Sequence, residues 1–221
     1  MKPVVAIDGY AGSGKGTMAL MLAQHLGFAH LDSGLLYRMA AYVQLNLVQE
    51  FTPEALGNVL AKMSLVDLLE MKQQVSENIL RTEAISLATT SISALPVVRN
   101  IITKFIREFA ANPGESYGGS VIDGRDIASV VIPDAACKIF MTAEPQIRAK
   151  RRFEALKVKN CSVTFEDVYK NMMARDQHDS SRNADPLTFN DDYIIVDTSN
   201  ETVEESFEKI VKIINDSVIN K

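Results

Sequence analysis

The chain has 221 residues, of which 47% are hydrophobic and 23% are charged, and its formal net charge is −5 at pH 7. These values are close to the averages for globular proteins and exclude disordered, collagen-like and coiled-coil chains. The negative net charge also excludes an overall basic field that would attract nucleic acid.

Short apolar runs alternate with helical patterns along the chain. Runs rich in Val and Ile that end at Gly or Asp indicate buried strands. We expect these strands at residues 3–8, 28–31, 120–123, 137–142 and 193–197. We expect helices at residues 18–26, 33–48, 82–94, 97–111, 144–159, 165–180 and 201–218, with another opening at Thr52, whereas residues 64–80 fit either type. The alternation predicts an α/β fold with a parallel, doubly wound sheet.

A glycine-rich segment, GYAGSGKGT over residues 9–17, follows the first strand and precedes a helix. Its glycines let successive backbone N–H groups point inward as an anion nest, and the positive end of the following helix points at the same place. Lys15 adds a point charge that can reach the terminal phosphates of a nucleotide. We therefore expect ATP-type phosphates to bind at Gly9, Tyr10, Ala11, Gly12, Ser13, Gly14, Lys15, Gly16 and Thr17. Gly16 stands where the strict pattern has a hydroxyl residue, which weakens the case for direct Mg²⁺ binding by the loop.

Three charged motifs follow farther along the chain. LDSGLLYR, residues 31–38, comes after the second strand, where open α/β sheets bind ligands. DGRD, residues 123–126, ends a buried strand, and Asp123 is placed to orient a hydrated Mg²⁺. In RDQHDSSR, residues 175–182, the charges at i, i+4 and i+7 share one helix face. Taken singly, these motifs also fit a helix cap, a turn and an exposed ion-pair ladder.

Together the motifs resemble those of the bacterial-type cytidylate kinases, nucleoside monophosphate kinases that phosphorylate CMP and dCMP. The resemblance runs from Ile7 to about Leu187 and rests on DGxxGxGKGT, LDSGxxYR, DGRD and RDxxDxxR. It implies a P-loop kinase fold with a five-stranded parallel sheet in the order 2-3-1-4-5, flanked by helices. It also implies one domain over residues 1–221, with an NMP-binding insertion at about 50–112 and a lid region and acceptor-binding helix at about 144–182.

The resemblance also implies roles for individual residues. It assigns CMP binding to Ser33, Arg38, Thr90, Arg99, Arg125, Asp126, Arg175, Asp179 and Arg182. Arg38 corresponds to a ligand of the acceptor phosphate, and Arg175 and Asp179 correspond to residues that contact the ribose hydroxyls. Thr90 stands where the family has a Ser, so a hydroxyl is kept. The stretch at 64–81 is shorter than the strand-rich segment that the family usually has, which puts a small sheet there in doubt.

The expected reaction is transfer of the γ-phosphoryl group of ATP to CMP or dCMP, giving CDP or dCDP plus ADP. The acceptor is already an anionic phosphate oxygen, so no general base is needed and catalysis reduces to positioning and charge neutralisation. Lys15, Arg125 and Arg182 are the expected catalytic residues, and Mg²⁺ is expected with ATP, held by Asp123 through water. Asp126 is expected to accept a hydrogen bond from the cytosine amine, while Arg125 or Arg99 donates to the ring acceptors. The basic residues Arg148, Arg151 and Arg152 fit either a closing lid that contacts ATP, above all through Arg151, or an exposed helix face.

Other classes of function share some of these features. A small-molecule kinase, such as a shikimate-type enzyme, would share the loop and the sheet but would not need DGRD and RDxxDxxR together. A nucleotide-dependent switch would carry internal NKxD and DxxG motifs, which the sequence lacks. The two cysteines, Cys137 and Cys161, form no CxxC pattern, and no apolar run approaches the ~18 residues of a membrane span. We expect a cytoplasmic monomer whose partners are ATP and CMP or dCMP, without nucleic acid or membrane.

Overall fold

A computed structural model of the protein describes residues 2–157, 163–182 and 184–215. The chain divides into two compact units. The sheet unit comprises Met1–Leu31 and Pro113–Lys221, and the helical unit comprises Asp32–Asn112. Among the described residues no single helix is long and apolar enough to cross a membrane; only the bent pair Glu83–Ile92 and Pro96–Ala111 meets that test, and it does so jointly.

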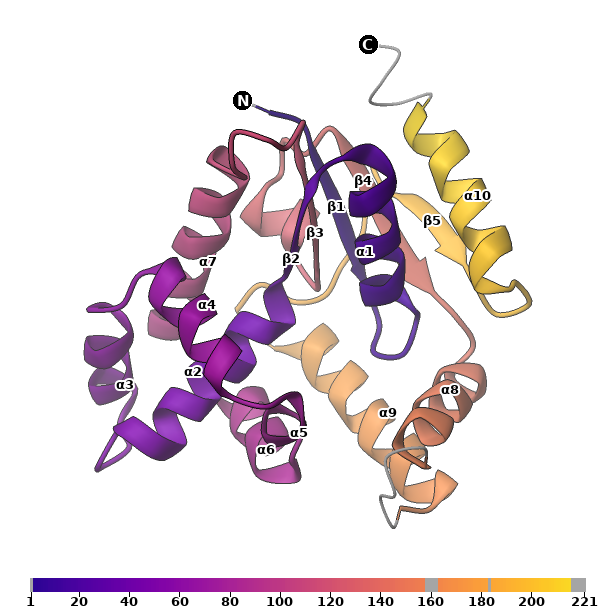
Figure 1. Ribbon diagram of the computed structural model, residues 1–221. Coiled ribbons are helices and arrows are strands. Elements are labelled where there is room, and N and C mark those ends of the chain that lie inside the picture. The colour runs from indigo at the N-terminus through magenta and orange to yellow at the C-terminus, as the bar shows by residue number, and fades with distance from the viewer. Residues whose placement is uncertain (1, 158–162, 183, 216–221) are drawn as a thin grey trace. The chain divides into compact units, whose positions relative to one another are not determined.

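A five-stranded sheet forms the centre of the sheet unit (Figure 1). Its strands are β1 (Val4–Gly9), β2 (Ala29–Asp32), β3 (Ser120–Gly124), β4 (Cys137–Thr142) and β5 (Ile194–Asp197). The strand order is β2-β3-β1-β4-β5, with β1 parallel to both β3 and β4, and β4 parallel to β5. The predicted fold class and strand order are confirmed.

The two faces of β1 have different partners. Val5 and Ile7 pack into the main core with α1 (Lys15–Leu26) and α10 (Val203–Ile214), which lie over the same face of the sheet in Figure 1. Because side chains alternate along a strand, Asp8 points to the opposite face. There it meets a short π-helical turn, η1 (Ile127–Val131), which the sequence did not predict.

The remaining helices of the sheet unit are α8 (Pro145–Lys157) and α9 (Phe165–Ser181), which pack against each other. The predicted ends of the 144–159 and 201–218 helices lie partly outside the described residues, as does Cys161. Cys137 is buried in the main core, and burial raises the pKa of its thiol to about 11. This cysteine is therefore an unreactive core residue.

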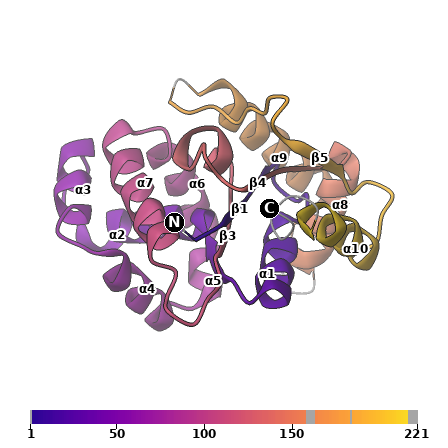
Figure 2. The same ribbon diagram turned by 90° about the horizontal axis from the view of Figure 1, so that it is seen from above.

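The helical unit contains α2 (Ser33–Leu47), α3 (Pro53–Leu60), α4 (Leu65–Gln74), α5 (Glu77–Leu80), α6 (Glu83–Ile92) and α7 (Pro96–Ala111). The described residues 32–112 form no strand apart from Asp32 at the end of β2, so the ambiguous stretch at 64–80 is helical. Ser64 and Asp67 form a reciprocal capping box that starts α4. In Figure 2, α3 lies along α7, and their contact is so close that a Cβ at Gly57 would lie 2.5 Å from Val97.

Candidate active site

The phosphate loop joins β1 to α1, and its shape depends on glycine. A Cβ at Gly9 would lie 2.0 Å from the carbonyl oxygen of Met141 on β4, so no side chain fits there. Gly14 has a φ of 88° and is the N-cap of α1 without a side-chain cap bond. The helix therefore begins at Lys15, three residues earlier than predicted, and a helix N-terminus directly after a glycine-rich loop is a place where anions bind. The Lys15 ammonium lies over the loop and donates to the Tyr10 carbonyl at 3.2 Å.

Two arginines of α8 lie near the loop, one in direct contact with it and one linked to it through Thr198. Arg148 on α8 donates to the carbonyl of Ala11 at 3.0 Å. Arg151 donates to the hydroxyl of Thr198 at 2.9 Å. That hydroxyl is in turn 3.3 Å from the carbonyl oxygen of Ser13. Arg148 is thus placed directly at the loop, and Arg151 reaches it through Thr198.

Asp123 ends β3 beside the start of α1. Its side chain is 5% exposed, and one carboxylate oxygen lies 2.9 Å from Nε2 of His30. The other oxygen faces Gly16, where an added Cβ would lie 3.8 Å away. No cluster of three or more His, Cys, Asp or Glu side chains that could hold a metal occurs in the described part of the chain. A lone carboxylate at this position fits Mg²⁺, which keeps several waters and is bound by one or two carboxylates together with substrate phosphates.

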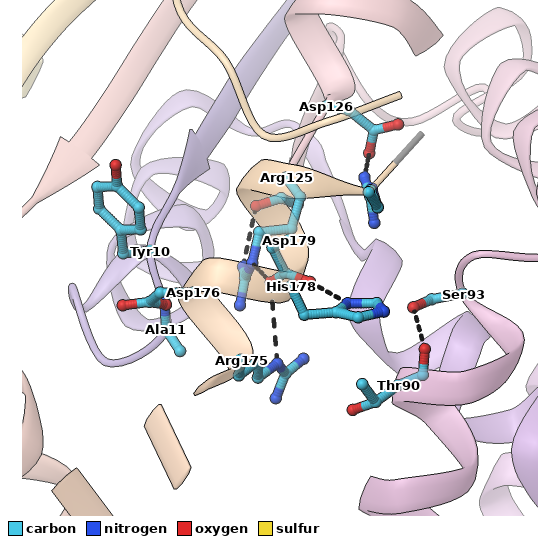
Figure 3. A network of polar contacts seen from close by, with 12 residues as sticks. Tyr10, Ala11, Thr90, Ser93, Arg125, Asp126, Arg175, Asp176, His178 and Asp179 are labelled. Atoms are coloured by element: carbon cyan, nitrogen blue, oxygen red, sulfur yellow. Dashed lines mark hydrogen bonds and ion pairs between the residues drawn. The ribbon is translucent and has the colours of Figure 1, made fainter. Parts of the chain in front are cut away.

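The charges of DGRD and RDQHDSSR come together in the sheet unit (Figure 3). Arg125 donates from Nε to the Asp179 carboxylate at 2.9 Å, and Nε of Arg175 lies 3.9 Å from the same oxygen. Burial by itself would raise the pKa of Asp179, but the guanidinium groups of Arg125, Arg175 and Arg182 outweigh it and hold the pKa below its usual value. Asp179 is therefore a buried, ionised anchor for the arginines, which is not the exposed ion-pair ladder that the sequence allowed.

Asp126 and Arg182 form the second pair of this cluster. A guanidinium nitrogen of Arg182 lies 3.6 Å from an Asp126 oxygen, and both side chains are under one-tenth exposed. Arg182 also donates to the carbonyl of Asp185 at 2.8 Å. Two carboxylates thus hold three guanidinium groups close together, and guanidinium groups bind phosphate oxygens through charge-assisted, often paired, hydrogen bonds.

Within the helical unit, the predicted residues gather around α6. Arg38 donates to the carbonyl of Leu80 at 2.8 Å and to the hydroxyl of Ser86 at 3.3 Å. The Thr90 hydroxyl donates to the Ser86 carbonyl at 3.1 Å, one helical turn away. Arg38 on α2 and Thr90 on α6 therefore both contact Ser86, and neither side chain is placed on a bare helix face.

Arg99 and Ser33 are both buried in the helical unit. Arg99 is 2% exposed, donates to the Ser93 carbonyl at 3.2 Å and lies over the ring of Tyr37 at 5.9 Å. Ser33 is the first residue of α2, and the helix cap is the preceding Asp32, whose side chain accepts from the Leu35 amide. The cap of this helix is therefore Asp32 and not Ser33.

Sequence reasoning missed a carboxylate next to the site. Asp8 is fully buried and accepts hydrogen bonds from the amides of Ile127 and Ala128 at 2.8 and 2.9 Å, and from the Tyr193 hydroxyl at 2.9 Å. It thereby holds the turn that follows Asp126. The signal was present in the sequence, since an Asp at the end of an apolar strand is unusual and needs partners.

Comparison with known proteins identifies the chain. The family model for cytidylate kinase matches residues 5–216. The cytidylate kinase of Azorhizobium caulinodans is 41% identical over 211 residues, which cover 96% of this chain and 97% of that protein. That of Fervidobacterium nodosum is 37% identical, with 96% of each chain covered.

The chain belongs to the cytidylate kinase family. It is therefore a kinase, and the resemblance inferred from its motifs is confirmed. A solved structure of an uncharacterized protein from Eubacterium ventriosum has a TM-score of 0.56 at 16% identity and covers 97% of this chain and 99% of its own. At that identity the likeness shows the fold alone.

The burial of Asp8 gives this cytidylate kinase a predictable response to pH. Burial raises the pKa of Asp8 to about 6 from 3.8, against the opposing hydrogen bonds. Between these pH values Asp8 is protonated in the folded protein but ionised in the unfolded chain. The stability that this proton contributes is therefore fully present below pH 3.8 and is lost as the pH rises through 6. We expect the free energy of unfolding of the wild type, relative to Asp8→Asn, to fall by about 2 kcal/mol between pH 4 and pH 7. Denaturant titrations of both proteins across that range measure this difference, and a constant difference would contradict the prediction.

Proposed function

We propose that the protein transfers the γ-phosphoryl group of ATP to CMP or dCMP, giving CDP or dCDP and ADP. The observation that carries this proposal is a charged cluster that lies in the sheet unit, as the phosphate loop does. Its members are Arg125, Arg175, Arg182, Asp126 and Asp179, and both carboxylates are buried. A group of guanidinium side chains suits an acceptor that is itself a phosphate. The match to the cytidylate kinase family supports the same assignment.

On this proposal, the donor side is the phosphate loop. The residues from Gly9 to Thr17 bind the ATP phosphates, and Lys15 neutralises charge on the terminal phosphates. Asp123 would hold Mg²⁺ through water, and the bound metal would supply charge neutralisation at the same phosphates. Arg151, tied to Thr198, lies near enough to the loop to assist ATP binding.

On the acceptor side, arginines orient the CMP phosphate and reduce its repulsion from ATP. Arg38 of the helical unit and Arg125 and Arg182 of the sheet unit have this role. Ser33, Thr90, Arg99, Arg175 and Asp179 bind the rest of the nucleotide. Because an arginine remains charged at any working pH and its fork matches phosphate oxygens, these residues work by positioning and electrostatics without a general base.

Asp126 is proposed to distinguish cytosine from uracil. A carboxylate accepts from the exocyclic amine of cytosine, whereas uracil presents a carbonyl at that position, and two acceptors would then face each other. Leaving a polar group without a hydrogen-bond partner in a closed site costs a few kcal/mol of binding free energy, which is enough to discriminate strongly between cytosine and uracil. We also propose that residues at about 50–112 act as the NMP-binding insertion and those at about 144–182 as the lid and acceptor helix of a cytoplasmic monomer.

The proposal is tested by measuring ADP release with ATP and Mg²⁺ in the presence of CMP, dCMP, UMP, AMP or no acceptor. We expect release with CMP and dCMP, and much less with UMP and AMP. Equal release without any acceptor would indicate an NTPase switch. Release with sugar acids but not with CMP would indicate a small-molecule kinase.

A further inference from the structure

A buried ion pair of Arg148 and Asp176 holds both polar backbone groups of one residue of the phosphate loop. The amide of Ala11 donates to the Asp176 carboxylate at 3.3 Å, and the carbonyl of Ala11 accepts from Arg148 at 3.0 Å. Arg148 and Asp176 also bind each other directly. Arg148 is 3% exposed and Asp176 8% exposed, so both charges depend on these contacts rather than on water.

Further contacts leave this pair little freedom to move. Nε of Arg148 donates to the Ala143 carbonyl at 2.8 Å, and its guanidinium lies over the Tyr10 ring at 5.0 Å. An added Cβ at Gly12 would lie 3.0 Å from the Arg148 carbonyl oxygen and 3.2 Å from the side chain of Met172. The loop therefore packs directly against α8 and α9, and a displacement of its backbone has to be passed on to these helices.

Asp176 lies on the helix that carries the acceptor-side charges. It directly follows Arg175 and precedes Asp179 by three residues, and Asp179 is the carboxylate that holds Arg125. Figure 3 shows Asp176 beside Ala11, with Arg175 and Asp179 projecting from the same helix. One helix thus contacts the loop through Asp176 and holds the arginine cluster through Asp179.

We propose that Arg148 and Asp176 are positioning residues that couple nucleotide binding at the phosphate loop to CMP binding along α9. This inference rests on the proposed function, because it takes ATP as the ligand of the loop and CMP as the ligand of the cluster. Phosphates that enter the loop shift the Ala11 backbone, and the ion pair transmits that shift to α9. Thermodynamic linkage requires the effect to be reciprocal, so CMP also tightens ATP binding by the same factor.

The experiment compares the affinity for CMP, measured by titration calorimetry, with and without a saturating non-hydrolysable ATP analogue and Mg²⁺. In the wild type we expect CMP to bind about tenfold more tightly with the analogue, within the usual range for coupled sites. In Asp176→Asn the carboxamide can still accept from Ala11 but has lost its charge, and we expect the factor to fall below about twofold. Asp176→Glu, which keeps the charge, should recover part of the coupling. Asp192→Asn is the matched control, because this exposed carboxylate pairs with Lys138 away from the loop and should keep the wild-type factor.

Thermal unfolding of each variant separates coupling from a merely structural role. A lower Tm with the wild-type coupling factor in Asp176→Asn would overturn the inference, as would a wild type without coupling. If Asp176→Asn does not fold, Arg148→Lys serves instead, because it keeps the charge and loses the fork that reaches Ala11 and Asp176 together; full coupling in that variant would also overturn the inference. A wild type that binds no CMP would reject the proposed function itself, whereas binding of both nucleotides without the expected loss in the variants would reject only the coupling role.

Discussion

Lys15→Met is expected to reduce kcat by on the order of 10²- to 10³-fold, which corresponds to about 2.7–4 kcal/mol of transition-state stabilisation. The substitution keeps most of the side-chain length and removes the charge that would neutralise the terminal phosphates of ATP. The fold should persist, because Lys15 is only half-buried and the bond to the Tyr10 carbonyl connects two parts of one loop. Steady-state kinetics with CMP measure the loss, and circular dichroism with thermal unfolding checks the fold.

Lys104→Met is the control for this substitution. Lys104 is 73% exposed on α7 and forms an i,i+4 pair with Glu108, so removal of its charge should leave kcat within about twofold. A Lys15→Met enzyme that retains more than about a tenth of the wild-type kcat would show that the loop amides and Mg²⁺ suffice without this ammonium, and would contradict the role assigned to it.

Asp126→Asn is expected to lower the CMP:UMP ratio of kcat/KM by about 5- to 150-fold, or 1–3 kcal/mol. The neutral amide can turn its NH₂ group toward the uracil carbonyl, which the carboxylate repels. Transfer of the phosphoryl group does not use this side chain, so kcat at saturating CMP should fall less than the ratio does. The measurement is kcat/KM for both nucleotides with each enzyme.

Arg182→Ala separates base recognition from charge neutralisation. It removes a guanidinium assigned to the phosphates and should therefore reduce turnover of CMP and UMP alike. The comparison matters because the Arg182 guanidinium lies 3.6 Å from Asp126. An Asp126→Asn enzyme that loses both activities equally would mean that Asp126 orients Arg182 and does not read the base.

Local patterns were sufficient to predict the sheet and the phosphate loop. Each strand is a short apolar run that ends at its own polar or glycine residue. The loop is one continuous segment, so its glycines and lysine are all visible together in the sequence. The 64–80 stretch was ambiguous because its apolar residues fit two periods, although Ser64 and Asp67 at i and i+3 were a readable helix start. The family resemblance supplied the strand order, which hydrophobic patterns do not specify.

Contacts between distant segments could not be predicted in the same way. The bond from the Ala11 amide to Asp176 spans 165 residues, and that from Arg148 to the Ala11 carbonyl spans 137. The π-helical turn after Asp126 begins at Ile127, whose amide donates to the buried carboxylate of Asp8, 119 residues earlier in the chain. Tertiary contacts of this kind override local propensity, and a single sequence carries no record of which partners meet.

The glycines of the loop are required for different physical reasons, and this matters when the motif is used to find related sequences. At position 9 the neighbouring strand requires glycine, because any Cβ would collide with the Met141 carbonyl whether or not a phosphate binds. At Gly14 an added Cβ would meet nothing within 4 Å, and only the φ of 88° favours glycine, so Asn, which tolerates such a φ better than most residues, fits there. A glycine at position 9 therefore indicates that β1 packs closely against β4, whereas Lys15 is the residue of the motif that indicates a phosphate ligand.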